Sequence, residues 1–129
     1  MVELFIPAPT VWLRTNTRGH WAPPAAATKT WRNAACVYAR HARLPRVDEL
    51  VIVEGWVKKK TRQRFDVDGH TPTLKACIDG LRDAGVLVED DQHHVLGTLM
   101  LAGKPDPKRP GLWVVLRPDL ARRYSDCQR

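Results

Sequence analysis

The stretch HTPTLKACIDGLRDAG, residues 70–85, carries the clearest helix signal in the chain. Thr71 is suited to cap a helix, and Pro72 is suited to its first position, where the missing amide hydrogen has no helical partner to lose. Gly85 is the kind of residue at which helices end. The apolar residues between these signals recur at helical spacing and are predicted to form the buried stripe: Leu74, Cys77, Ile78 and Leu81.

The segments around this helix predict the rest of the fold. A second helix is expected around Trp31, where apolar residues also recur at helical spacing, and Pro45 stops it. The order βαβαββ predicts one α/β (α+β) domain over residues 1–129, with a mixed four-stranded sheet packed against two main helices. Residues 119–129 are expected to fray as a basic tail. The predicted strands are residues 2–6, 49–57, 94–103 and 111–118.

The chain has a large positive charge. Its 129 residues include 21 Lys and Arg against 14 Asp and Glu, for a net charge of +7. This balance favours a polyanionic partner such as nucleic acid, and generic solubility is the alternative explanation. Three cysteines without a CxxC pair predict neither a disulfide framework nor a zinc ribbon. No apolar run has membrane-spanning length and the start MVELFIPAPT does not resemble a signal peptide, so we expect an intracellular protein without a membrane partner.

Two acidic groups flank the helix of residues 70–85. Asp66 and Asp68 precede it and share one face if the backbone is extended. The group Glu89-Asp90-Asp91 follows it, and we expect the returning chain to bring Asp91 beside the first pair. Clustered carboxylate oxygens suit Mg²⁺ or Mn²⁺, and such ions activate water for phosphodiester hydrolysis. The alternative is that these acids belong to ordinary turns, since DxD pairs also occur by chance at strand ends.

A basic run, KKKTRQR at residues 58–64, leads into the first acidic pair. We expect it to contact the DNA backbone, whose phosphates attract Lys and Arg without regard to sequence. Asp79 lies one turn after Lys75 on the same helix face, so a simple ion pair with Lys75 or Arg82 is its expected role. The candidate DNA contacts are Lys58, Lys59, Lys60, Arg62, Arg64, Arg14, Arg18 and Arg32.

The segment DVDGHTPTLKACIDGLRDAGVLVEDDQHHV, residues 66–95, resembles the signature of RusA-type Holliday junction resolvases. The shared features are D-x-D, a lysine at the start of a helix, D-x-L and A-G within it, and D-D before a strand. The similarity continues in register through a proline-bearing first strand, a polar loop with Asn16 and His20, and a basic helix. The spacing from D-x-D to the lysine is similar to that of phage-encoded members.

This resemblance implies a homodimeric, Mg²⁺-dependent endonuclease that resolves four-way DNA junctions by paired symmetric nicks, with Mn²⁺ able to substitute. It also implies a cytoplasmic location in a bacterial or phage-infected cell. Position by position, Asp66, Asp68 and Asp91 resemble the metal-binding carboxylates, with Asp90 as their accessory. Lys75 resembles the catalytic lysine.

One position departs from the family pattern. Many relatives have Asn directly after the second Asp, where this chain has Gly69. Asn can hydrogen-bond its own backbone and fix such a turn, whereas Gly only permits the turn. Either the loop is looser here, or His70 or Thr71 supplies the missing polar group.

The aromatic and histidine residues allow further interpretations. Trp12 and Trp21, in the irregular segment after the first strand, are candidates to stack on junction bases. Trp31, Trp56 and Trp113 are instead predicted to fill the core. A zinc site built from His70, His93, His94 and Cys77 is disfavoured, because adjacent strand histidines face opposite ways and Cys77 belongs to the apolar stripe. His93 and His94 are expected to be exposed strand residues, with DNA contact or proton transfer as the alternative.

Two classes of function remain open from the sequence. The first is a metal-dependent junction endonuclease, with a general phage nuclease for flaps or branched DNA as its nearest enzymatic rival. The second is a non-catalytic DNA-binding module, for which the basic charge suffices. The acids at positions 66, 68, 89, 90 and 91 favour an enzyme, because a pure binder gains nothing from carboxylates that repel its phosphates.

Overall fold

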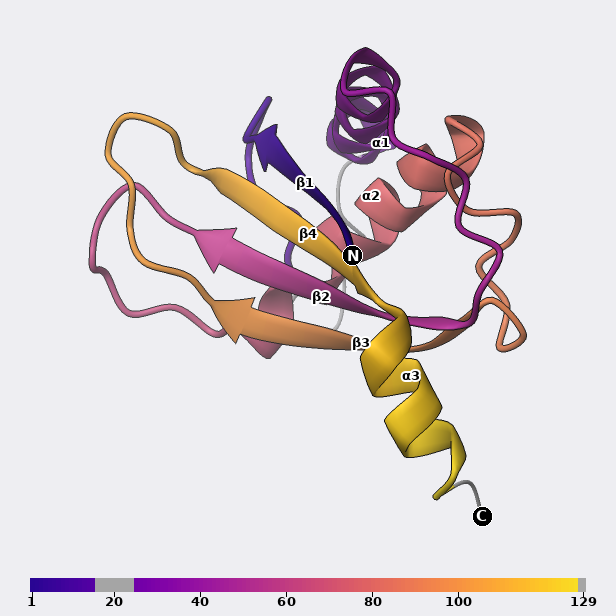
Figure 1. Cartoon of the computed structure of the whole chain (residues 1–129). Coiled ribbons are helices and arrows are strands. Elements are labelled where there is room, and N and C mark those ends of the chain that lie inside the picture. Colours follow the sequence, from indigo (N-terminus) through magenta and orange to yellow (C-terminus); the bar gives the residue numbers. More distant parts are fainter. Residues whose placement is uncertain (16–24, 128–129) are drawn as a thin grey trace.

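One mixed sheet of four strands organises the molecule (Figure 1). The computed structural model describes residues 1–15 and 25–127 of the chain. In the sheet order β1-β4-β2-β3, the first two pairs are antiparallel and β2 pairs with β3 in parallel. The predicted α+β fold with a mixed four-stranded sheet is therefore confirmed. The strands are β1 (Val2–Pro7), β2 (Val51–Lys58), β3 (Val95–Ala102) and β4 (Gly111–Arg117).

Helix α2 (Thr71–Asp83) connects the parallel strands β2 and β3, as parallel pairing requires. It covers the same face of the sheet as α1 (Ala25–His41). A Cβ atom at Gly55 in β2 would lie 3.1 Å from both methyl carbons of Leu74, so this glycine lets α2 approach the sheet closely. The strand residues buried in this core are Leu4, Ile6, Val51, Val53, Val57, Leu112, Val114 and Leu116.

The two large helices also pack closely against each other. A Cβ atom at Gly80 in α2 would lie 2.3 Å from the carbonyl oxygen of Arg32 and 2.7 Å from the Cβ atom of Ala35, both in α1. The fully buried Trp31 and the small residue Ala39 complete the face that α1 turns to the core. The apolar stripe predicted for α2 is confirmed, including a fully buried Cys77.

The C-terminal segment forms helix α3 (Pro118–Ser125) and packs on β2. The expectation that residues 119–129 fray is therefore wrong for the part that the structure describes. Arg117 explains the difference, because its Nη1 lies 3.0 Å from Oε2 of the buried Glu54 and its Nη2 lies 2.8 Å from Oδ2 of Asp119. These ion pairs tie the start of α3 to the outer face of the sheet, away from α1 and α2.

Two of the tryptophans predicted to fill the core lie on this outer face instead. Trp113 is 36% exposed, and Trp56 is half-buried opposite it on the neighbouring strand. Their ring centroids are 6.3 Å apart. Alternate residues of a strand point to opposite faces of the sheet. The neighbours of these tryptophans, such as Val57 and Val114, point into the core under the helices, so the two rings point to the other face. The core prediction is correct for Trp31 alone among the three.

The ends of α2 and β3 differ in detail from the prediction. Thr71 does not cap α2, because the 3₁₀-helix η1 (Asp68–His70) runs directly into it and the Thr71 hydroxyl donates to the carbonyl of Asp68 at 2.7 Å. His93 and His94 lie in a turn before β3 rather than on the strand. Across the described ranges, no helix is long and apolar enough to cross a bilayer.

The Gly80 contact generates a stability prediction. Replacing a helical glycine with alanine ordinarily favours a helix, but Gly80→Ala would drive a methyl group into the Arg32 carbonyl. We expect a loss of about 1–3 kcal/mol in the free energy of unfolding, measured by urea or thermal denaturation. Gly97→Ala in β3 is the matched control, since its added Cβ would meet no atom within 4 Å. Wild-type stability in Gly80→Ala would contradict this packing.

Candidate nucleic-acid interface and acidic site

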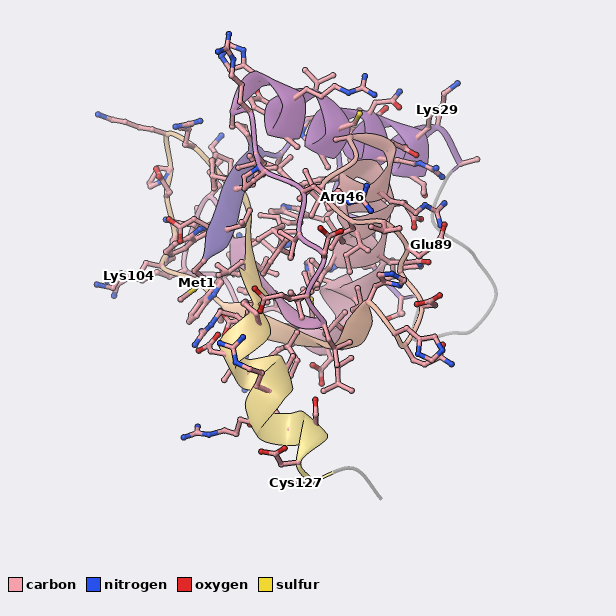
Figure 2. All side chains as sticks on the ribbon, turned by 45° about the vertical axis from the view of Figure 1, so that its right-hand side comes forward. Met1, Lys29, Arg46, Glu89, Lys104 and Cys127 are labelled. Atoms are coloured by element: carbon pink, nitrogen blue, oxygen red, sulfur yellow. The ribbon has the colours of Figure 1, made fainter. Side chains whose placement is uncertain are left out.

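Two basic loops meet at the end of the sheet where β2 and β3 finish (Figure 1). One is the predicted run after β2, and the other joins β3 to β4. A backbone hydrogen bond links them, with the amide of Asp106 donating to the carbonyl of Lys59 at 2.9 Å. Figure 2 shows Lys104 of the second loop on the opposite side of the fold from Glu89. We call this surface the cationic end.

The described carboxylates leave the basic side chains of the cationic end unpaired, and Asp106 in the second loop accepts from backbone amides instead. Among described residues, none of its Lys or Arg side chains forms a salt bridge, whereas Arg82 and Arg117 elsewhere are paired. The sequence did not predict DNA contacts at Lys104, Lys108 and Arg109. Their turn, KPDPKR, is visibly basic, but it indicates a DNA contact only once the two loops are known to meet. The basic side chains of the cationic end are those of the two loops, together with Arg14, which adjoins the first loop. They are Arg14, Lys58, Lys59, Lys60, Arg62, Arg64, Lys104, Lys108 and Arg109.

The turn that carries Asp66 and Asp68 is held by the side chains that follow it. His70 is fully buried, and its Nδ1 lies 2.7 Å from the carbonyl oxygen of Asp66. Because a carbonyl only accepts, this ring nitrogen must carry the proton and donate it. Together with the bond from Thr71 to Asp68, this contact shows that both His70 and Thr71 hydrogen-bond to the turn, as the second alternative expected. A Cβ atom at Gly69 would lie 2.9 Å from Oδ2 of Asp66, so glycine leaves room for that carboxylate.

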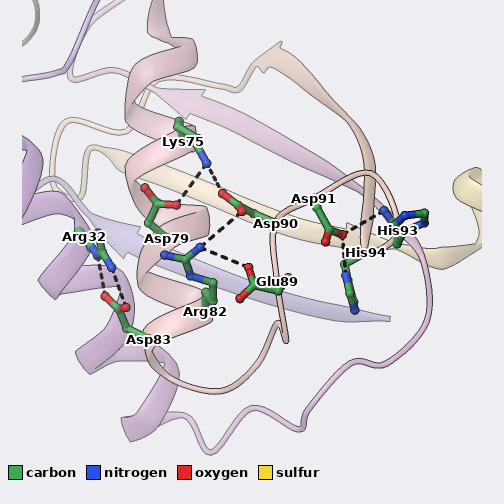
Figure 3. Close-up of polar contacts among 10 residues, drawn as sticks. All are labelled: Arg32, Lys75, Asp79, Arg82, Asp83, Glu89, Asp90, Asp91, His93 and His94. Carbon is green, nitrogen blue, oxygen red and sulfur yellow. Dashed lines mark hydrogen bonds and ion pairs between the residues drawn. The ribbon is translucent and has the colours of Figure 1, made fainter.

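Lys75 links the helix to the acids that follow it (Figure 3). Its Nζ lies 3.2 Å from Oδ1 of Asp79 and in direct contact with Oδ2 of Asp90. The predicted pairing of Asp79 with Lys75 is therefore confirmed. Arg82 adds a second cation, with Nη1 3.4 Å from Oδ1 of Asp90 and 3.6 Å from Oε2 of Glu89.

These contacts set the charge states of Lys75 and Asp90. The hydrogen bond from Lys75 holds the pKa of Asp90 below its ordinary value. Burial would lower the pKa of Lys75, but its hydrogen bonds to Asp90 and Asp79 raise it above its ordinary value. Near neutral pH the pair is therefore an ammonium and a carboxylate.

Asp91 points away from Lys75 and toward the turn before β3 (Figure 3). Its Oδ1 accepts from the backbone amide of His93 at 3.0 Å and from Nδ1 of His94 at 2.7 Å. The hydrogen bond from His94 lowers the pKa of the Asp91 carboxyl, so the group is ionised.

The carboxylates expected to share a metal ion are not gathered in one place. Within residues 1–15 and 25–127, no three His, Cys, Asp or Glu side chains lie close enough to hold a common ion. Asp90 and Asp91 have the partners given above. Asp66 and Asp68 are exposed, and in the same part of the chain their carboxylates form no hydrogen bond or salt bridge. The structure thus brings Lys75 to Asp90 and leaves the first acidic pair unpaired.

The acids after α2 and the cationic end occupy opposite ends of β3. Residues 89–91 precede the strand, whereas the basic loops adjoin its last residue. An extended strand of 8 residues separates the two regions by about 25 Å. The basic run leads directly into Asp66, whereas Asp91 precedes β3, at the other end of that strand from the basic loops.

The remaining predicted residues have other surroundings. Arg32 forms a two-point ion pair with Asp83, at 2.6 and 2.8 Å, which gives it a structural partner between α1 and α2. Trp12 is half-buried, with its ring 5.1 Å from that of Trp31, and is not a free-standing wedge. Arg18 and Trp21, like Asn16 and His20, lie outside the described residues.

No protein-family model matches this chain, and no curated protein matches it either. A proposed function must therefore rest on the side chains of the site and on the sequence motif.

The buried His70 generates a prediction about pH. Burial lowers the pKa of His70 below its ordinary 6.5, so the unfolded chain binds more protons than the folded one as the pH falls through that value. We expect the free energy of unfolding to be level above this range and to decrease from pH 7 to pH 5.5, where most carboxylates remain ionised. Denaturant titrations at a series of pH values measure this change.

The matched variants are His70→Phe and His41→Gln. His70→Phe loses the bond to Asp66 and should be less stable throughout, but with a flatter pH profile. His41 is exposed at the end of α1, and its replacement should leave the slope as it is in the wild type. An unchanged slope in His70→Phe would assign the pH dependence to other groups.

Proposed function

We propose that the chain is a Mg²⁺-dependent endonuclease that resolves four-way DNA junctions by paired nicks as a homodimer. The contact between Lys75 and Asp90 gives this proposal its main support. It joins the two parts of the motif, before and after α2, through the residue types that phosphodiester hydrolysis uses. A lysine shared between two carboxylates on a strongly basic protein has no evident role in simple DNA binding.

The donor groups of the site match the chemistry of the metal. Asp66, Asp68 and Asp91 would supply carboxylate oxygens to Mg²⁺, or Mn²⁺ in its place, with Asp90 as an accessory, since these ions prefer such ligands. Because these side chains do not share one place in this structure, Asp91 would have to leave His93 and His94 to join the ion. The exposed carboxylates of Asp66 and Asp68, unpaired within the described ranges, can turn toward an ion at little cost. When bound, the ion supplies activation of water and neutralisation of developing charge.

Lys75 has two roles in this proposal. Its ammonium lowers the pKa of Asp90 and holds that carboxylate in place. The same ammonium can exchange its carboxylate partner for the scissile phosphate and stabilise the charge that grows there. Because the Lys75 side chain is 58% exposed, a phosphate can approach it from solvent.

The cationic end supplies the binding surface for the DNA backbone. Its distance from the acids after α2, about 25 Å along β3, is spanned by about seven base pairs of duplex. A junction arm lying along the sheet would therefore contact the basic loops and the acidic site together. The same unpaired cations would also serve a non-catalytic DNA-binding module, which is the second candidate function.

The homodimer follows from the symmetry of the reaction. Paired nicks on a two-fold symmetric junction require two active sites related by a two-fold axis. The outer face of the sheet offers apolar side chains for such an interface, including Trp113 and Leu99, which is 43% exposed. Exposed apolar side chains that gather on one face are a common mark of a protein interface.

A cleavage assay tests the proposed function. A labelled four-way junction should be cut in opposite strands in the presence of Mg²⁺ and remain intact with EDTA. Asp68→Asn should abolish cleavage and leave junction binding equal or tighter, because a metal ligand is lost and repulsion of phosphate is relieved. Binding without cleavage by the wild-type protein would favour the DNA-binding module, and equal cutting of flaps would favour a general branched-DNA nuclease.

Lys75→Ala tests the catalytic lysine. Its ion pairs are partly exposed and stabilise the fold by no more than about 1 kcal/mol, so the variant should fold. We expect junction affinity close to the wild-type value and a cleavage rate at saturating protein at least about a hundredfold lower. The control is Lys29→Ala, which removes an exposed lysine of α1. A variant that binds poorly but cuts normally at saturation would make Lys75 a docking residue.

A further inference from the structure

A hollow of about 330 Å³ opens at the cationic end, between the segment that follows β1 and the loop that follows β2. Its volume lies at the lower limit of the range for small-ligand sites, about 300–1,000 Å³. It combines two aromatic rings with four basic side chains. The residues that matter here are Trp12, Phe65, Arg14, Lys59, Lys60 and Arg64.

The two rings share one cation. Nζ of Lys59 lies 4.8 Å from the ring centroid of Trp12 and 5.2 Å from that of Phe65, over both rings. The fully buried His70 contacts the same two rings edge to face, at centroid distances of 5.6 and 5.3 Å. Because His70 is inside the fold and Lys59 is partly exposed, the rings are fixed from the inner side and covered by a flexible side chain on the outer side.

The hollow has an excess of positive charge. No carboxylate lines it, and its basic side chains form no salt bridge with any residue that the structure describes. Burial and the nearby Arg14 both lower the pKa of Lys59, so its charge is poorly accommodated without an anion. A bound anion would relieve that repulsion.

We infer that this hollow binds one unstacked nucleotide of a DNA strand, with the base on the rings of Trp12 and Phe65 and the phosphate at Lys59 and Arg14. A site for phosphate alone would not need two rings, and a site for a base alone would not need four cations. The inference rests on the proposed function only in taking DNA as the source of the nucleotide. A free nucleotide has the same chemistry, and the experiment below separates the two sources.

Lys59 makes the exchange favourable. In the absence of DNA its half-buried ammonium covers the ring faces in a cation–π contact. A charge-assisted hydrogen bond to phosphate is stronger, so the ammonium moves to the backbone and the base takes its place on the rings. Base stacking on aromatic side chains tolerates any base, so this site would favour unpaired DNA without selecting a sequence.

Two single strands of equal length and charge provide the test. One is a fluorescein-labelled strand of ten thymidines, and the other has abasic residues in place of all ten. Affinities are measured by fluorescence anisotropy in EDTA, so that cleavage does not contribute. The wild-type protein should bind the thymidine strand about tenfold or more tightly, as expected when one base stacks on protein rings. Equal affinity for the two strands would overturn the inference.

Four variants test whether the difference in affinity between the two strands arises in the hollow. Phe65→Leu keeps an apolar side chain and should bring the affinity for thymidine down toward that for the abasic strand. Lys59→Met should weaken binding of the thymidine strand by about tenfold. Lys104→Met removes a charge of the cationic end outside the hollow and should weaken both strands equally and by less. Tyr124→Leu removes an exposed ring of α3, outside the hollow, and should change neither.

Melting temperatures close to that of the wild type establish that the variants fold. Equal loss of affinity for both strands in Phe65→Leu would overturn the inference even if the wild type discriminates. Displacement of the thymidine strand by thymidine 5′-monophosphate, at concentrations where inorganic phosphate has no effect, would identify free nucleotides as ligands of the hollow. Absence of displacement would assign the hollow to nucleotides within a strand. If the protein discriminates between the strands but never cuts a junction, the nucleotide site is supported and the proposed nuclease function is wrong.

Discussion

The close approach of α2 to its two neighbours is the constraint on which the rest of the fold depends. Gly55 lets Leu74 settle on the sheet, and Gly80 lets the opposite side of the same helix touch the backbone of α1. With both contacts made, the orientation of α2 is fixed. Its exposed edge then presents Lys75 to Asp90, and its first residues continue the turn that carries Asp66 and Asp68. The candidate site is therefore positioned by two residues that have no side chains.

The main elements of the fold were predictable because their signals are local. The apolar stripe of α2 and the runs of Val, Ile and Leu in the strands are periodic patterns within short windows, and the sheet with its two large helices follows from them. Helix α3 was missed because its anchor is an ion pair between Arg117 and Glu54, which are far apart in the sequence. The exposure of Trp113 was missed for a related reason, since composition does not reveal which face of a sheet the helices cover.

The candidate site was predictable in its residues more than in its geometry. The pairing of Lys75 with Asp79 follows from helical spacing, and the support of the turn by His70 and Thr71 was foreseen as one of two possibilities. The distance between Asp91 and the basic loops depends instead on the parallel register of β2 and β3, which the sequence does not specify. The same register explains the contribution of Lys104, because it ends β2 and β3 together and brings their following loops into contact.

The pairing of β1 with β4 has a consequence for how the protein is made. Val2 lies opposite Leu116, so two paired strands are separated by more than a hundred residues of sequence. Contacts between residues so distant in sequence form slowly, because a long loop must close before the strands are joined. During synthesis, the apolar residues Leu4 and Ile6 therefore remain uncovered by β4 until residues 111–117 have left the ribosome. We expect the pairing of β1 with β4 to be the last step that closes the sheet.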